Sequence, residues 1–174
     1  MKKVNLNKLI ITGMSIALCT VMPLAFHAIP DGGKMFSPMH MPVLICAIAC
    51  GFQYGAICGA VGPIISSLTT GLPAMGNLAP MVIECMAYGI IAGIMMKFVR
   101  TRSKVFNLYA SLVVAMICGR IIAGIAKALY FSPGITLDSW ISAYFVISLP
   151  GIIVQLLLIP PIVYALDKAK LIKI

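Results

Sequence analysis

The stretch from Met35 to Ile83 contains no Lys, Arg, Asp or Glu, and it limits what this chain can fold into more than any other feature. It is longer than the about 20 residues that one membrane-spanning helix needs. Prolines divide it, at Pro38, Pro42, Pro63, Pro73 and Pro80. Small residues recur at four-residue spacing in its middle, at Gly51, Gly55 and Gly59. We therefore expect two short, closely packed helices, at about 38–51 and 54–70, with a turn between them.

The composition excludes an ordinary soluble domain. Of the 174 residues, 61% are hydrophobic and only 10% are charged, far from the soluble average. The length suggests a single domain, residues 1–174. The apolar stretch at 9–26 follows three lysines, as in a signal peptide, but no small-residue cleavage site comes after it. We therefore expect an integral membrane protein in which this stretch remains as the first span.

The apolar segments predict an all-α integral membrane protein, a bundle of six transmembrane helices. The expected helices cover about 6–28, 38–51, 54–70, 80–99, 106–130 and 138–166. Outer loops are expected at about 29–37, 71–79 and 132–134. Asp138 is expected to cap the last helix, and the prolines at Pro150 and Pro160–Pro161 are expected to bend it. We find no internal repeat, which disfavours an inverted-repeat transporter that works alone.

Most of the basic residues form three clusters that follow the positive-inside rule. They precede the first predicted helix, interrupt the middle of the chain and follow the last helix, at Lys2, Lys3, Lys8, Lys97, Arg100, Arg102, Lys104, Lys168, Lys170 and Lys173. The rule places these clusters, and with them both chain termini, in the cytoplasm. A net charge of +9 would suggest nucleic-acid binding in a soluble protein. Here a lipid bilayer explains the distribution, and we expect no nucleic-acid partner.

Three charged residues fall inside predicted helices, where an ionisable side chain usually faces a cavity or a partner. They are Glu84 in the fourth helix and Arg120 and Lys127 in the fifth. Arg120 and Lys127 are seven residues apart, hence on one face and roughly 10 Å from each other. In one interpretation Glu84 pairs with a cation and locks two helices together. In the other, all three line an outward-opening pocket, whose excess positive charge favours a carboxylate that Arg120 can hold through two hydrogen bonds.

Five uncharged or weakly basic residues are candidates for the same pocket. Tyr88 lies one helical turn after Glu84, and Asn77 lies near the outer end of the fourth helix. Trp140 and Tyr144 could contact a ligand or serve equally as anchors at the membrane interface. His40 follows the first outer loop, where it is either a hydrogen-bonded interfacial residue or a ligand contact.

Metal binding is a minor alternative. His40 lies close in sequence to Met35, Met39 and Met41, and imidazole with thioether sulfur would suit Cu(I). All six cysteines fall inside predicted helices without a C-x-x-C pair, which favours small buried thiols. Cys46 and Cys50 lie on the same face of the second predicted helix, and a soft-metal site there is the alternative interpretation. We expect no metal and no cofactor in this chain.

These residues together resemble a known family. A six-helix chain of this size, basic at both ends, with the small-residue motif Gly13-x-x-x-Ala17 in its first helix, resembles the substrate-binding S components of energy-coupling factor (ECF) transporters, the vitamin-uptake branch of the ATP-binding cassette importers. The segments 37–46, 51–55 and 62–67 are similar to the second and third helices of that family. Gly119-Arg120 followed by Gly124 is similar to its fifth helix.

The resemblance implies that ligand binding and ATP hydrolysis are carried out by different subunits. S components sit in the plasma membrane, here a bacterial one, and capture a micronutrient from outside. They then dock on a transmembrane coupling subunit driven by two cytoplasmic ATPases, and the family model has the S component topple in the membrane. Docking would use Gly13 and Ala17, where the family motif has alanines. This chain has no G-x-x-x-x-G-K-[ST] motif, so we expect no enzyme activity in it and ATP hydrolysis in its partners.

The resemblance also places the ligand near the outer surface, which matches the charged positions. Pantothenate or another carboxylate-bearing vitamin is the first candidate ligand, because of Arg120 and Lys127. A pyrimidine-like vitamin precursor stacked on aromatic side chains is the second. Two other classes remain: a small Cu-like metal or metabolite transporter or channel without an ATPase, and an intramembrane enzyme using Glu84, His40 or Cys85. Against the enzyme, we find neither H-E-x-x-H nor a nucleophile with an evident base.

Overall fold

The computed structural model describes residues 6–27, 29–30, 32–99, 101–131 and 136–172, without the side chains of His27, Lys34 and Leu137. Over these ranges the chain contains helices and turns but no strand, which confirms the expected all-α class. In chain order the helices, with π-helical turns marked η, are α1 (Leu6–His27), α2 (Gly32–Phe36), α3 (His40–Cys50), α4 (Phe52–Thr70), α5 (Met75–Phe98), α6 (Lys104–Ala126), η1 (Lys127–Phe131), α7 (Leu137–Ile141), η2 (Ser142–Val146) and α8 (Leu149–Lys168). Four predicted basic positions, Lys2, Lys3, Arg100 and Lys173, lie outside the described residues.

Four helical segments in these ranges are long and apolar enough to cross a membrane. They are Leu6–Phe26, Met75–Phe98, Lys104–Phe131 and Asp138–Lys168. The two helices expected between 38 and 70 are present as α3 and α4, but neither belongs to this set. Six membrane crossings therefore stay a prediction.

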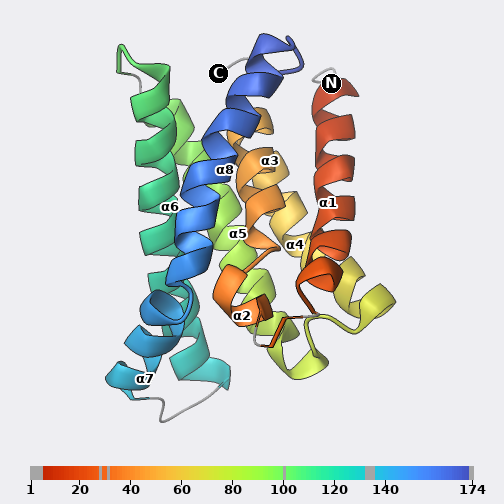
Figure 1. The fold of residues 1–174 in the computed structure, drawn as a ribbon, viewed down its shortest axis with the longest axis vertical. Coiled ribbons are helices and arrows are strands. Elements are labelled where there is room, and N and C mark those ends of the chain that lie inside the picture. Colours follow the sequence, from red (N-terminus) through yellow and green to blue (C-terminus); the bar gives the residue numbers. More distant parts are fainter. Residues whose placement is uncertain (1–5, 28, 31, 100, 132–135, 173–174) are drawn as a thin grey trace.

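The two ends of the bundle differ in what they contain. Figure 1 shows the start of α1, the end of α8 and the α5–α6 connection at one end, and α2, α7 and the α4–α5 connection at the other. The first end carries the described basic clusters, including Lys104, which pairs with Asp167 over 3.1 Å. We call the opposite end the α2 end.

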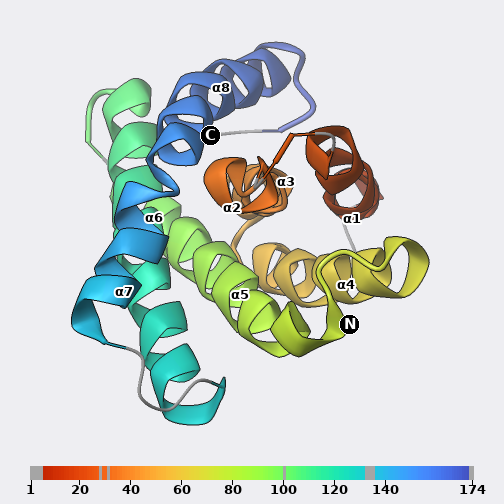
Figure 2. The same ribbon diagram turned by 60° about the horizontal axis from the view of Figure 1, so that its bottom comes forward.

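The short helix α3 occupies the middle of the bundle. Figure 2 shows α2 and α3 surrounded by α1, α4, α5 and α8, and α3 contacts each of these four long helices. Every residue of α3 except Ile45 is buried. The helix stops at Gly51, whose φ of 101° suits glycine, and α4 starts at once at Phe52. The predicted turn at 51–54 is therefore reduced to one residue.

Small residues let α4 and α5 approach backbone to backbone. A methyl group added to Gly89 would collide with the backbone of Gly55, and one added to Gly59 would collide with the carbonyl group of Cys85. Because lipid tails are as apolar as side chains, helices in a membrane associate through such close packing rather than through exclusion of water. The glycine spacing seen in the sequence thus holds α4 against α5.

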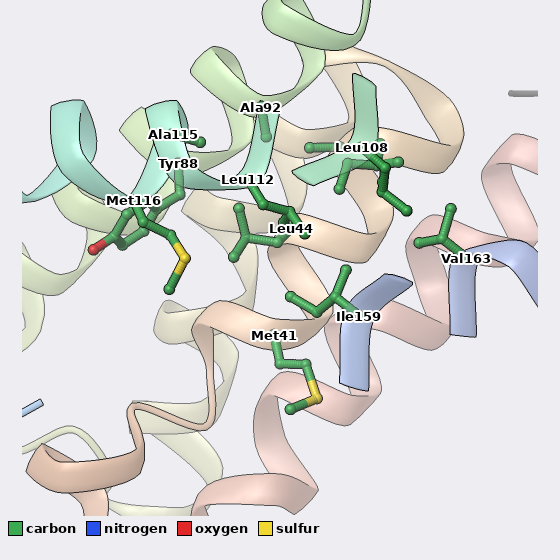
Figure 3. Close-up of a cluster of buried hydrophobic side chains, with 12 residues drawn as sticks. Met41, Leu44, Tyr88, Ala92, Leu108, Leu112, Ala115, Met116, Ile159 and Val163 are labelled. Carbon is green, nitrogen blue, oxygen red and sulfur yellow. The ribbon is translucent and has the colours of Figure 1, made fainter. Parts of the chain in front are cut away.

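The main core joins α3, α5, α6 and α8. Figure 3 shows Leu44, Tyr88, Leu112, Met116 and Ile159 meeting in one cluster. A second buried cluster contains the thiols of Cys19, Cys46, Cys50, Cys58 and Cys85, all free. These two clusters lie next to the cavity described below and fix the helices that line it.

Two boundaries at the α2 end differ from the sequence prediction. The first outer loop contains the helix α2, and α5 begins at Met75 rather than near Pro80. Pro80 lies inside α5, close enough to its start that the missing N–H interrupts little. Asn77 is therefore in the first turn of a helix rather than in a loop. The hydroxyls of Ser66 and Ser67 hold the shortened α4–α5 connection by donating to the carbonyl oxygens of Leu72 and Pro73 over 2.6 and 2.8 Å.

The last predicted helix is broken into α7, η2 and α8. Thr136, not Asp138, is the N-cap of α7, and its hydroxyl oxygen accepts from the backbone N–H of Ser139 over 3.3 Å. The break falls at Ser148, so Pro150 lies in the first turn of α8, where proline is tolerated. The prediction of a bend near Pro150 was close, but the assignment of Asp138 as the cap was wrong.

Candidate functional site

A cavity of about 640 Å³ lies at the α2 end of the bundle. This volume is in the range that small-molecule sites usually have. Its walls come from the end of α1, the α1–α3 connection, the start of α3, the α4–α5 connection, α5, α6 with η1, and η2. The lining residues are Pro23, Ile29, Pro30, Gly32, Gly33, Ser37, Pro38, Met39, His40, Leu72, Pro73, Ala74, Asn77, Pro80, Met81, Glu84, Arg120, Lys127, Ala143, Tyr144, Ile147 and Ser148.

All three charged residues singled out from the sequence line this cavity. Arg120 on α6 is only 2% exposed, and Glu84 on α5 is 9% exposed. No ion pair joins Glu84 to Arg120 or Lys127 within the described part of the chain, and the Arg120 guanidinium has no hydrogen-bond partner there. The interpretation in which Glu84 locks two helices through such a pair is therefore not what the structure contains.

Glu84 instead contacts Tyr88 and His40. Tyr88, one turn further along α5, donates its hydroxyl to Glu84 Oε1 over 3.2 Å. The Nε2 atom of His40 lies 3.5 Å from the same oxygen. The His40 ring meets the Tyr88 ring edge to face, with centroids 4.7 Å apart and planes at 76°. These three side chains form a compact polar group between α3 and α5.

Lys127 and Tyr144 form the opposite part of the wall. The Lys127 Nζ atom lies 5.9 Å from the centre of the Tyr144 ring, at the start of η1, a distance typical of a cation–π contact. Lys127 is half-buried, so its ammonium group has access to both the cavity and its rim. Asn77, at the start of α5, is exposed at the rim.

Two of the predicted site residues do not line the cavity. Tyr88 is buried behind Glu84, and its ring occupies the space that a side chain at Gly119 would need. Trp140 lies against Gly124 and contacts the rings of Tyr144 and Phe145, with centroids 6.2 and 5.6 Å away. Both support lining residues from outside. The glycines of the fifth-helix motif thus make room for aromatic side chains.

The residues that shape the rim of the cavity are not among those predicted from the sequence. The most informative is Gln155 on α8, which is buried and whose amide nitrogen donates to the carbonyl oxygens of Phe36 and Ser37 over 3.4 and 3.3 Å. These bonds tie α8 to the α1–α3 connection. A lone amide side chain in an otherwise apolar helix is costly in lipid. This cost is the sequence signal that could have identified Gln155 as a residue with a specific polar contact.

The small-residue motif of α1 lies far from the cavity lining. Gly13 and Ala17 are both exposed, and a methyl group added to Gly13 would meet no other atom within 4 Å. Large apolar side chains are exposed beside them, among them Met14, Leu18 and Val21. This face of α1 is therefore open and apolar.

The Met and His residues considered for Cu(I) are divided between the cavity and the core. Met39 and His40 line the cavity, whereas Met41 lies in the main core (Figure 3). Among the described residues, no group of three or more His, Cys, Asp or Glu side chains is arranged to hold a metal ion.

The fold and the cavity define a class of protein, an all-helical membrane protein with a solute-sized cavity at one end, whose mostly apolar wall contains a few charged side chains. Comparison with known families is more specific. The family model for the substrate-specific component of ECF transporters matches residues 7–163. The protein therefore belongs to the family of ECF transporter substrate-specific components. No curated protein and no solved structure matches the chain significantly.

Membership in this family establishes the general function and confirms the resemblance. The chain is a substrate-binding subunit of a transporter, not an enzyme, and it works with an ECF module in the membrane whose ATPases are separate subunits. Its apolar helices fit a multi-pass membrane protein.

Proposed function

We propose that this chain captures a small, anionic, vitamin-like molecule from outside the cell and delivers it by docking on the transmembrane coupling subunit and its two ATPases. Pantothenate is the first candidate. The observation that carries this proposal is the buried guanidinium of Arg120, which lines the cavity without an ion-pair or hydrogen-bond partner among the described residues.

A buried charge without a partner is costly, so such groups are normally paired. An Arg120 guanidinium in a cavity wall is satisfied when a ligand with a carboxylate enters, because its planar fork can donate to two carboxylate oxygens at once. Lys127 adds a second positive charge on the same helix. The cavity also leaves room for the uncharged remainder of a molecule of vitamin size.

The proposed orientation places the cavity on the outer side. The described basic residues at the start of α1, around the α5–α6 connection and at the end of α8 lie at the end opposite the cavity. The positive-inside rule then makes that end, with both chain termini, cytoplasmic. Six crossings in one domain then follow from α1, α3, α4, α5, α6 and the α7–α8 segment. With 11 residues, α3 is only about 16 Å long, about half of the hydrocarbon thickness. The cavity and α2 occupy the space between α3 and the outer surface.

The open face of α1 is the proposed contact with the coupling subunit. Gly13 and Ala17 are exposed there, and small residues let a partner helix approach closely. A surface without deep side-chain interlocking also suits a protein that rotates in the membrane and docks reversibly. The charged residues of the binding site lie on other helices, so binding and docking are separable.

The direct test is to identify what the protein carries. The full chain is purified from its host membranes in mild detergent, and the small molecules released by denaturation are identified by mass spectrometry. The proposal expects an acid at near-stoichiometric amount, together with a coupling subunit and two ATPases in the same pull-down. A bound metal ion, a purely cationic molecule or a chain that never recovers an ATPase pair would contradict it.

A further inference from the structure

We propose that the ligand has two recognised ends: an acid group held by Arg120 and Lys127, and an N–H or O–H donor group held by Glu84 and His40. This inference rests on the proposed function and adds the second end. It excludes simple monoacids with an apolar tail, and it excludes diacids that would place a second carboxylate beside Glu84.

The first argument is that Glu84 keeps an acceptor for the ligand. Its Oε1 atom is engaged by the Tyr88 hydroxyl and lies near His40. Its Oε2 atom has no hydrogen-bond or ion-pair partner among the described residues, although the side chain is about nine-tenths buried and lines the cavity. A carboxylate oxygen in that position favours a donor from the ligand.

His40 provides the second argument. It is 3% exposed and lines the cavity, and neither of its ring nitrogens has a hydrogen-bond partner within the described chain. Buried polar atoms in proteins are normally satisfied. Because His40 Nε2 lies only 3.5 Å from Glu84 Oε1, the imidazole stands beside the carboxylate, and a polar group of the ligand that reaches Glu84 Oε2 comes next to His40 as well.

The position of this polar group is fixed from behind. Tyr88 donates to Glu84 and stacks edge to face on His40, and its own ring fits against Gly119 of α6. Gly119 immediately precedes Arg120. The same tyrosine therefore sets the spacing between the donor-binding end and the α6 wall that carries the acid-binding end, so Tyr88 is a positioning residue rather than a ligand contact.

Opposite charges that share a cavity but do not pair support a ligand between them. Glu84 and Arg120 both line the cavity, yet no ion pair within 4.0 Å connects them in the described structure. An acid with an apolar tail would satisfy Arg120 and leave the Oε2 atom of Glu84 without a partner. A ligand with an acid at one end and a donor at the other satisfies both charges.

The test compares matched acids on the purified full chain, freed of endogenous ligand, by isothermal titration calorimetry. One pair is pantothenate and N-(3,3-dimethylbutanoyl)-β-alanine, which keeps the carboxylate and amide but lacks both hydroxyl groups. The other pair is biotin, with ureido N–H groups, and lipoate, without a donor at its far end. We expect at least one two-ended acid to bind about 10-fold or more tightly than its partner, as one hydrogen bond to a charged group predicts.

The variant Glu84→Gln links this preference to the proposed residue. It should lower the affinity for the two-ended acid, which loses a charged acceptor. It should raise the affinity for the one-ended acid, because the charge that repels it is gone, so the ratio of the two affinities falls toward one. Tyr88→Phe should lower the same ratio by a smaller factor. Asp138→Asn removes an exposed acid at the same end, outside the cavity lining, and should leave the ratio unchanged.

The outcomes separate this inference from the proposed function. If one-ended acids bind as tightly as two-ended ones, or if Glu84→Gln leaves the ratio of the two affinities unchanged, the proposal that Glu84 and His40 bind a donor group is wrong, while the proposal of acid capture stands. If no acid in the panel binds, both are overturned. Circular dichroism and gel filtration of each variant establish that the comparison is made on folded protein.

Discussion

The side-chain amide nitrogen of Gln155 donates to the carbonyl oxygen of Ser37 over 3.3 Å and so connects α8 to the rim of the cavity. It donates also to the carbonyl oxygen of Phe36 over 3.4 Å. The next helical turn toward the α2 end brings Gly151 against the carbonyl oxygens of Met35 and Phe36, where a methyl group would not fit. The α1–α3 connection is therefore held on α8 by polar contacts and by close packing.

Replacement of Gln155 by leucine should speed ligand release. The change keeps a similar volume but removes both hydrogen bonds, a loss of about 1–3 kcal/mol. The Ser37 carbonyl oxygen keeps the backbone N–H of His40 as a donor over 3.1 Å. We expect the dissociation rate, measured by chasing bound radiolabelled ligand, to rise by about 5-fold or more. Gln53→Leu is the matched control, since Gln53 is exposed at the start of α4. An unchanged rate in the Gln155 variant would mean that this contact does not hold the rim.

Glycine replacement on α5 should show that α4 and α5 depend on backbone contact. Gly89→Ala places a methyl group against the backbone of Gly55, and such overpacking typically costs about 1–3 kcal/mol. We expect a lower Tm, read by a thiol-reactive fluorophore that reports the five buried cysteines as they become accessible on unfolding. Gly76→Ala, in the same helix with no atom within 4 Å of the added methyl group, should leave the Tm nearly unchanged. Equal effects of the two changes would contradict the proposed packing.

Bulky residues on the open face of α1 should separate docking from binding. Gly13→Leu or Ala17→Leu is expected to abolish uptake in cells and co-purification of the coupling subunit, while ligand affinity of the isolated protein stays as in the wild type. The reason is that a partner helix cannot approach a leucine as closely as a glycine or alanine. Ala165→Leu, at an exposed position of α8, is the control and should support normal uptake. Loss of ligand affinity in the α1 variants would argue against a docking role.

Much of this fold was predictable because the strongest signals are local. Runs of apolar residues between glycines, prolines and charges located every long helix except α8 to within about five residues. The segment predicted as one last helix is divided into α7, η2 and α8. The cost of placing ionisable groups in lipid singled out Glu84, Arg120 and Lys127, and all three share one cavity. That these three side chains face one cavity could be predicted without knowing which helices are in contact.

The remaining features depend on contacts between distant segments. Pro80 resembles a helix start, yet α5 begins at Met75 because the serines of α4 hold the connection before it. Trp140 has the character of an interfacial or ligand-stacking residue, but Gly124 offers its indole a place outside the cavity. The sequence places Tyr88 one helical turn from Glu84, whether or not Tyr88 lines the cavity. The packing of its ring against Gly119 of α6 decides that it lies outside the cavity lining, beside the Glu84 carboxylate.

The affinity of Arg120 variants for the acid that the protein carries tests the central claim most directly. Loss of a charge-assisted hydrogen-bonded pair is worth about 1.5–3 kcal/mol, so Arg120→Ala should weaken binding by about 10-fold to 100-fold, with normal membrane insertion and an unchanged gel-filtration profile. Arg120→Lys should keep part of the affinity that Arg120→Ala loses. The control Arg102→Ala, at an exposed position of the opposite end, should bind the acid as tightly as the wild type. A folded Arg120→Ala protein that binds the acid as tightly as the wild type would contradict the account.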